Sequence, residues 1–212
     1  MRKIDKGEPM AEFEQFVRSH NPRCWEDSAG ISRVWREYML EFEQHKLSAY
    51  TELYLLDLNE THIDHFKKRE LFNDLVFNWN NLVVDSKDDS FGARYKDNHI
   101  HSQLDNERLI NPIEEDAASF FQYVSTGKMI PAEGLTDDER QRAQYTIEIF
   151  NLNESGVMDR RKSILNNDNS AYNGLSDEDV LQYLQELGFP SVIEQLLKER
   201  KQRRMPYDDK ET

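Results

Sequence analysis

The stretch from Thr61 to Asp97 constrains this chain more than any other. It opens with a short run of alternating apolar and polar residues that ends in Asp64-His65, a pattern typical of a half-buried strand. A second β-like run covers residues 76–84 and contains Asn81. A polar segment follows, with room for one to two helical turns before Asp97. The sequence therefore predicts a strand that ends in Asp-His, a strand that contains Asn, and then a short helix.

This order of elements is expected of a ββα-metal (HNH) site, and its residue types suit phosphodiester hydrolysis. That reaction needs an activated water and a cation that stabilises charge on the phosphate and on the leaving oxygen. Asp64 would give a carboxylate to a hard divalent cation. His65, on the other side of the strand, would act as general base, because histidine titrates at about pH 6.5. Asn81 would bridge two backbone segments and hold the loop that carries the histidine.

Spacing alone does not fix the metal ligands besides Asp64. His62 and Asp97 are the further candidates, although nothing in the spacing selects Asp97 over its neighbours Asn98, His99 and His101. The common alternative is that such histidines and Asp-His pairs are ordinary surface or core residues.

Basic residues surround the same stretch in an otherwise acidic chain. Lys96 could touch phosphate as a point charge. Lys67, Lys68 and Arg69 directly follow the Asp-His pair, and Arg94 lies in the predicted helix. These four are candidates for nucleic-acid binding, against the alternative that a charge run is simply a solvated face.

Several longer motifs carry a resemblance to a known family: Met1-Arg2-Lys3-Ile4, His62 to Phe66, Phe77 to Leu82, Gly92 to Asp97, Leu109 to Pro112 and Thr146 to Asn153. With these motifs, over nearly its whole length, the chain resembles the HNH endonuclease subunit of Septu-type anti-phage defence systems (the PtuB family), including the forms that accompany retrons. The resemblance implies a metal-dependent nuclease beside an ABC/SMC-like ATPase (the PtuA family), and also a retron reverse transcriptase with its RNA–DNA product as a partner. It gives Asp64 the role of metal-binding acid, His65 that of general base and Asn81 that of the central asparagine.

The chain departs from that family at one place. Many members carry two Cys-x-x-Cys pairs that hold a structural zinc, whereas the corresponding segments here, 48–51 and 85–90, have no cysteine, and the only cysteine is Cys24. No structural four-cysteine zinc is therefore expected, and packing by Phe91 and Tyr95, or a partner, would have to hold the helix. The expected cofactor is a divalent metal, Mg²⁺ first, with Mn²⁺ or Zn²⁺ as alternatives.

Composition limits the partners and the compartment. The 212 residues carry a formal net charge of −14, which does not suit unaided binding of nucleic acid. We expect either a basic partner that holds the substrate or local basic patches. A single cysteine fits a reducing compartment, and there is no apolar run long enough for a membrane span and no signal peptide. The predicted location is the cytoplasm.

The predicted fold is α+β, mostly helical, with the ββα-metal centre embedded. Residues 1–165 would form the nuclease domain with its helical support, and residues 166–212 a C-terminal helical docking segment. The apolar spacing, the capping boxes and the turn residues predict helices over 9–20, 31–42, 137–150, 157–165, 177–187 and 190–204, a strand over 50–58, a hairpin over 120–124 and 128–131, a loop over 97–112, a flexible joint over 166–173 and a disordered tail from 205. The basic clusters 160–162 and 198–204 could contact nucleic acid or the ATPase.

Two other classes of function stay open. The missing cysteines would fit an inactive nuclease-like adaptor that bridges the ATPase and a retron complex, and a purely structural regulator of the ATPase is a third possibility. The sequence does not distinguish DNA from RNA, transfer RNA included, as the substrate.

Overall fold

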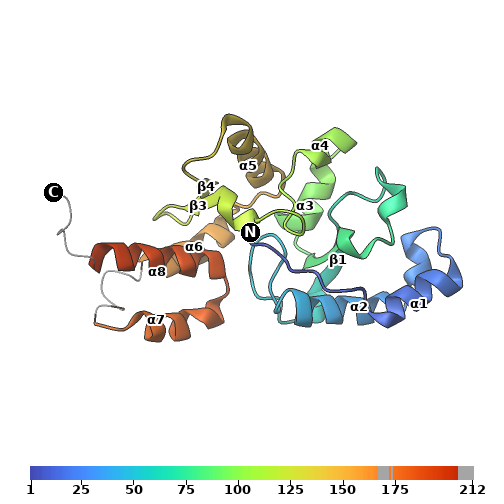
Figure 1. Cartoon of the computed structure of the whole chain (residues 1–212), viewed down its shortest axis with the longest axis horizontal. Helices are drawn as coiled ribbons and strands as arrows, with labels where there is room; N and C mark the ends of the chain where they lie inside the picture. Colours follow the sequence, from blue (N-terminus) through green and yellow to red (C-terminus); the bar gives the residue numbers. More distant parts are fainter. Residues whose placement is uncertain (167–171, 173, 205–212) are drawn as a thin grey trace, which may run out of the picture.

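Helices dominate the structure, a computed structural model that describes residues 1–166, 172 and 174–204. Two small antiparallel sheets accompany them, and the predicted α+β class is confirmed (Figure 1). The helices are α1 (Ala11–His20), α2 (Ser32–Tyr38), α3 (Gly92–His99), α4 (Gln103–Glu107), α5 (Asp137–Ile149), α6 (Ser155–Asn166), α7 (Asp177–Leu184) and α8 (Pro190–Arg204). The strands are β1 (Thr61–His65), β2 (Leu82–Ser86), β3 (Phe121–Tyr123) and β4 (Met129–Pro131).

The sheet that positions the candidate site is the antiparallel pair of β1 and β2. Its register places Asp64 opposite Val83 and His65 opposite Leu82. Residues 82–84 are fully buried, as expected of a strand covered on both faces. The helix α3 follows β2 and contacts it, so the chain has the strand, strand and helix order that the sequence predicts.

The second strand starts later than predicted. Residues 76–81 do not form a strand; Trp79–Asn81 forms a 3₁₀ turn instead. The side chain of Asn78 accepts a hydrogen bond of 3.0 Å from the backbone N–H of Asn80, which gives the backbone a local alternative to the sheet. The prediction of a strand over the whole range 76–84 was therefore wrong.

Two further predictions were wrong for similar local reasons. The segment 50–58 makes only an isolated bridge between Leu47 and Tyr54, because the hydroxyl of Ser48 accepts hydrogen bonds from the next turn of backbone. The predicted loop 97–112 contains the end of α3 and the whole of α4. The side chain of Ser102 caps α4 by accepting from the N–H of Asp105, so a Ser-x-x-Asp pattern was the missed signal for this helix.

The other helices and the hairpin are confirmed, with the expected capping boxes at Thr136 and Ser176. Most of the predicted joint 166–173 and the tail from residue 205 lie outside the described residues. None of the helices in the described part of the chain combines the length and the apolar character that a membrane span requires.

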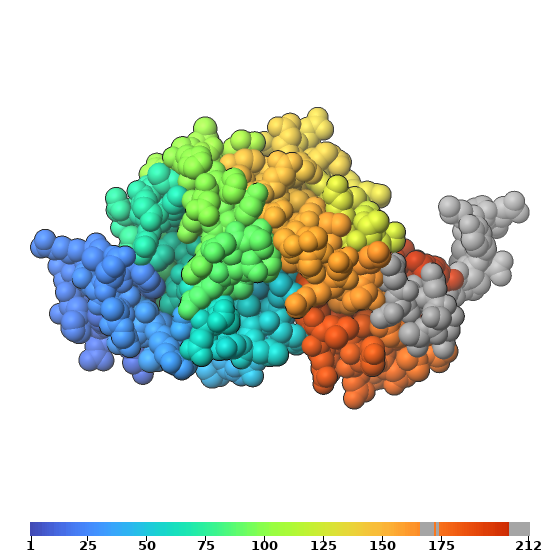
Figure 2. Space-filling view, turned by 180° about the vertical axis from the view of Figure 1, so that it is seen from behind, coloured from blue at the N-terminus to red at the C-terminus, as the bar shows by residue number. Residues whose placement is uncertain are grey.

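Two apolar clusters form the core. The smaller one lies between α1, α2 and β2 and contains Phe13, Phe16, Trp35, Met39, Leu40, Trp79, Leu82 and Val84. The larger one runs from β2 and α3 through α5 and α6 to α8. Figures 1 and 2 show α1 and α2 at one end of the molecule, α7 and α8 at the other, and the β1–β2–α3 unit between them. Residues on both sides of position 165 share the larger cluster, and the predicted domain boundary there stays a prediction.

Candidate functional site

A recess of about 280 Å³ opens beside the end of β1. The residues that line it are Trp25, His62, Ile63, Asp64, His65, Lys68, Arg69, Glu70 and Asp97. All three predicted metal ligands and the predicted general base are in this set. The Asp-His pair comes from β1 and Asp97 from α3, so it is the pairing of β1 with β2 and the packing of α3 on β2 that bring them together.

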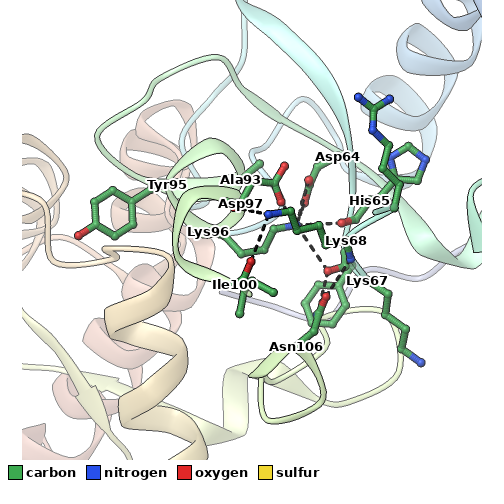
Figure 3. A network of polar contacts seen from close by, with 12 residues as sticks. Asp64, His65, Lys67, Lys68, Ala93, Tyr95, Lys96, Asp97, Ile100 and Asn106 are labelled. Carbon is green, nitrogen blue, oxygen red and sulfur yellow. Dashed lines mark hydrogen bonds and ion pairs between the residues drawn. The ribbon is translucent and has the colours of Figure 1, made fainter. Parts of the chain in front are cut away.

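Asp64 is buried and is held by two neighbours. Lys96 Nζ lies 2.8 Å from Oδ2 and 3.0 Å from Oδ1 of this carboxylate (Figure 3). The hydroxyl of Tyr50 also donates to Oδ2. Burial by itself would raise the pKa of Asp64, but attraction to the Lys96 ammonium leads the opposing effects and lowers it below its ordinary value. Asp64 is therefore ionised at neutral pH and paired inside the protein.

Lys96 is completely buried. Besides Asp64, its ammonium donates to the backbone oxygen of His65 at 2.8 Å. Burial would lower its pKa, yet the carboxylates of Asp64 and Asp97 raise it above the ordinary value. The prediction that Lys96 contacts phosphate is not supported by this arrangement, because the ammonium has no exposed surface.

His65 is held in one tautomer. Its Nε2 lies 3.0 Å from the carbonyl oxygen of Val76, which can only accept, so Nε2 carries the proton and Nδ1 has the free lone pair. The ring packs edge-to-face against Trp25, with centroids 4.6 Å apart. Burial lowers the pKa of His65 in spite of the nearby Asp64 charge. A neutral imidazole with one free nitrogen is the state that a general base requires.

Asn81 lies between two backbone segments, as its predicted bridging role requires. Its Oδ1 accepts from the N–H of Lys67 at 2.7 Å, and its Nδ2 donates to the carbonyl oxygens of Lys67 at 3.0 Å and Leu75 at 3.3 Å. The amide thereby fixes the chain directly after His65 to the segment that precedes β2. Its importance for catalysis stays a prediction.

His62 and Asp97 each keep one buried polar atom without a hydrogen bond. These atoms are Nδ1 of His62 and Oδ1 of Asp97. Lys96 Nζ is 3.2 Å from that Asp97 oxygen, an ion-pair distance, but at an angle that does not make a hydrogen bond. Burial, and then the Asp64 charge, raise the pKa of Asp97 to about 6. Burial lowers the pKa of His62. Buried polar atoms are normally satisfied, so two such exceptions beside one recess point to a ligand.

The donor set fits a divalent cation in its chemistry. Two carboxylates and an imidazole are suitable ligands for Mg²⁺, Mn²⁺ or Zn²⁺, and two of their atoms lack partners. As arranged, however, both oxygens of Asp64 are engaged. Within residues 1–166, 172 and 174–204, no three His, Cys, Asp or Glu side chains are grouped closely enough to hold an ion.

The predicted nucleic-acid contacts are all paired within the chain. Lys67 lies 3.8 Å from Glu114, Arg69 3.2 Å from Glu26, and Arg94 3.0 Å from Asp89. Only Lys68 and Arg69 of the four line the recess. The ammonium of Lys68 donates to the carbonyl oxygens of Asp97 and Ile100 at 2.6 and 3.1 Å, where it caps the C-terminus of α3.

Two basic clusters further along the chain were predicted as surfaces and are partly internal. Arg161 is fully buried, and Arg200 is 5% exposed with its guanidinium 3.3 Å from Asp177.

His99 and His101, which follow Asp97 in the sequence, do not line the recess. His99 is exposed and stacks on Tyr95, with ring centroids 4.1 Å apart.

Sequence reasoning missed the residues that hold α3. Asp85 accepts from the N–H of Ala93 at 2.8 Å and from the hydroxyl of Ser48, which also binds Thr51. Gly92 has φ +72°, and a Cβ there would lie 2.2 Å from Oδ2 of Asp85. Ser48, Thr51 and Asp85 thus form a hydrogen-bond network that anchors the start of α3. The sequence did contain one signal of this network: Asp85, an acidic residue at the end of an apolar strand.

Neither the family models nor the curated protein sequences that were compared with the chain match it.

Proposed function

We propose that this chain is an HNH-type endonuclease that hydrolyses phosphodiester bonds, with the β1–β2–α3 unit as its active centre. The observation that carries the proposal is the state of His65. Its Nε2 is fixed by the Val76 carbonyl, and its ring shares one recess with Asp64, Asp97 and His62. An oriented neutral imidazole beside carboxylates in a recess is a general base with a place for a reacting group.

The chemistry follows from these positions. Nδ1 of His65 would take a proton from a water molecule as the water oxygen attacks phosphorus, and the bond from phosphorus to the bridging oxygen breaks. Lys68 and Arg69 line the recess and would face the negative phosphate. His62, Asp64 and Asp97 would hold the divalent cation, which, when bound, stabilises charge on the phosphate and on the leaving oxygen. Asn81 keeps the segment after His65 in position.

The partners are part of the same proposal. A net charge of −14 and basic residues that are already paired do not favour binding of nucleic acid by this chain alone. A basic partner would bring the substrate and would attract the acidic surface. The family resemblance makes that partner an ABC/SMC-like ATPase, in a complex that also contains a retron reverse transcriptase and its RNA–DNA product.

The test compares His65→Gln with His99→Gln. The glutamine side chain in the first variant can still donate to the Val76 carbonyl but is no base, whereas His99 is exposed and lies outside the recess. Cleavage of DNA and of structured RNA, transfer RNA included, is measured with and without the ATPase, in Mg²⁺, in Mn²⁺ and in chelator. Loss of cleavage in the first variant alone supports the proposal. Equal cleavage by both variants contradicts it.

One observation favours the adaptor as a second candidate. Both oxygens of Asp64 are occupied by Lys96 and Tyr50, as they would be in a centre that no longer needs a metal. If biological defence survives His65→Gln unchanged and no condition gives cleavage, the adaptor is the better description.

A further inference from the structure

The ammonium of Lys96 lies in a pocket of oxygen atoms. Around its Nζ are Oδ2 and Oδ1 of Asp64 at 2.8 and 3.0 Å, the carbonyl oxygens of His65 and Phe66 at 2.8 and 3.5 Å, and Oδ1 of Asp97 at 3.2 Å (Figure 3). Carboxylate and carbonyl oxygens around a cation are also the environment that a hard divalent ion selects. The ammonium group of Lys96 therefore fills a position that could also bind a metal cation.

This internal cation leaves the cluster incomplete. An ammonium has three protons, and those of Lys96 are directed to Asp64 and to the backbone, so Oδ1 of Asp97 receives charge without a hydrogen bond. The Nδ1 atom of His62, which lines the same recess, has no hydrogen-bond partner. The carboxylates of Asp64 and Asp97 thus share the one Lys96 ammonium, and the Asp97 side chain is 43% exposed.

From these contacts we propose that Lys96 is a built-in competitor of the divalent cation. The proposal rests on the proposed function, because it concerns the same site. In the resting chain the Lys96 ammonium holds Asp64, and an ion that takes Asp64, Asp97 and His62 as ligands must displace it. Two cations cannot share one buried carboxylate without strong repulsion. The free chain therefore binds metal weakly, and Lys96 keeps the centre closed until it moves.

The direct test is metal affinity without nucleic acid. Mn²⁺ binding to the full chain is measured by calorimetry and by the electron paramagnetic resonance signal of free Mn²⁺, for wild type, Lys96→Met and Lys68→Met. Methionine keeps most of the length of the lysine side chain but has no charge. Lys68 is the matched control, because it lines the recess and is bound to carbonyl oxygens only.

We expect Lys96→Met to bind Mn²⁺ at least about tenfold more tightly than wild type, and Lys68→Met to gain no more than about threefold, because Lys68 acts on Asp97 only through its charge and holds no carboxylate. Asp64→Asn in the Lys96→Met background should remove the gain. An affinity of Lys96→Met equal to that of wild type overturns the proposal. So does absence of binding in a folded Lys96→Met chain, or an equal gain in Lys68→Met.

A second measurement covers the case in which Lys96→Met does not fold. Buried, hydrogen-bonded ammonium groups of lysine give ¹⁵N signals, and Lys6 offers an internal reference because it is also buried and is paired with Glu43 away from the recess. Lys6→Arg assigns the two signals. Saturating Mg²⁺ should shift or remove the Lys96 signal and leave that of Lys6 in place. An unchanged Lys96 signal, or no Mg²⁺ binding at all, overturns the proposal.

These readouts separate this inference from the nuclease proposal. Tighter metal binding without cleavage would support the competition by Lys96 and count against the enzyme. Cleavage by wild type, with no change of metal affinity in Lys96→Met, would support the nuclease proposal and contradict the competition by Lys96.

Discussion

The described part of the chain buries two lysine–carboxylate pairs, and they differ in how completely their neighbours are satisfied. Lys6 binds Glu43 and also donates to the Leu82 carbonyl at 3.1 Å, while Glu43 accepts from Trp79 Nε1 at 2.9 Å and from the N–H of Gly7 at 3.2 Å. No polar side-chain atom of Lys6, Glu43 or Trp79 lacks a partner. Lys96 and Asp64 are equally buried, yet their neighbours His62 and Asp97 each keep one buried atom without a hydrogen bond.

The difference separates a structural pair from a candidate site. Burying charge costs free energy that only a complete set of partners offsets. The Lys6–Glu43 pair has that set and joins the N-terminal segment to the smaller core cluster, with Lys6 4.4 Å above the Trp79 ring. The Lys96–Asp64 pair leaves two groups unsatisfied and opens on a recess. An incomplete cluster is less stable than it could be, which is expected where a ligand binds.

The largest expected effect is on cleavage and concerns His65 alone. His65→Gln should lower the cleavage rate about 10²- to 10⁴-fold, the usual contribution of a general base, whereas Lys6→Met should leave the rate of the remaining folded protein near that of wild type. Single-turnover cleavage measures the rates of both variants. Circular dichroism gives the concentration of folded protein, which is kept equal. If His65→Gln and Lys6→Met lowered the cleavage rate equally, the distinction between a candidate site and a structural pair would be wrong.

The structural pair should dominate stability. Glu43→Ala leaves the Lys6 ammonium buried without its partner, and we expect a loss of about 3–5 kcal/mol in the free energy of unfolding. Glu41→Ala is the matched control, because Glu41 is 52% exposed and its pair with Lys46 spans 3.4 Å; its effect should stay below about 1 kcal/mol. Urea unfolding measures both changes. A loss for Glu43→Ala no larger than for Glu41→Ala would contradict the assignment.

The support of α3 should be visible as a pH dependence. Burial raises the pKa of Asp85 from 3.8 to about 7, so between these values the folded chain holds a proton that the unfolded chain releases. This contribution to stability is complete below pH 3.8 and is lost as the pH rises through 7. Asp85→Asn removes it and can still accept from Ala93.

The measurable quantity is the difference in unfolding free energy between Asp85→Asn and wild type. It should shift in favour of the variant from pH 3.8 to pH 7, by at most about 4 kcal/mol, and stay constant above. Urea titrations at a series of pH values give the curve. A difference that does not depend on pH would show that Asp85 is ionised in the folded protein throughout.

The bridging amide should have an intermediate effect. Asn81→Ala removes the acceptor of the Lys67 N–H and two donated bonds, and a buried group left without a partner costs about 1–3 kcal/mol. Because the lost bonds fix the segment after His65, cleavage should fall as well, with the metal affinity unchanged. The exposed neighbour Asn80 serves as control. A stability loss without loss of cleavage would make Asn81 a purely structural residue.

These comparisons also show what the sequence could and could not predict. The Asp-His pair, Asn81 and the capping boxes are local signals, so the strand β1, the bridging amide and the helices α5 and α7 followed from them. The pairing of Lys96 with Asp64 joins positions 32 residues apart, and no local pattern distinguishes such a lysine from one that faces solvent. The start of β2 was predicted too early because Asn78 caps a 3₁₀ turn, which competes with extension of the strand. The guanidinium of Arg161 lies over the rings of Tyr123 and Phe189 at 5.5 and 5.7 Å, and both are far from it in the sequence, so no local pattern indicates its burial.

The smallest expected effect concerns the exposed cations at the mouth of the recess. Arg69 is 37% exposed and faces Glu26 and Glu70 at 3.2 and 3.5 Å. Such pairs contribute little, so Arg69→Gln should change the unfolding free energy by no more than about 0.5 kcal/mol. If Arg69 exchanges these carboxylates for a phosphate, the salt dependence of nucleic-acid binding by the chain with the proposed ATPase partner should weaken by about one unit of slope. Lys87→Gln, away from the recess, should leave the slope unchanged. Equal slopes for wild type and Arg69→Gln would remove Arg69 from the substrate path and leave Lys68 as the remaining candidate cation there.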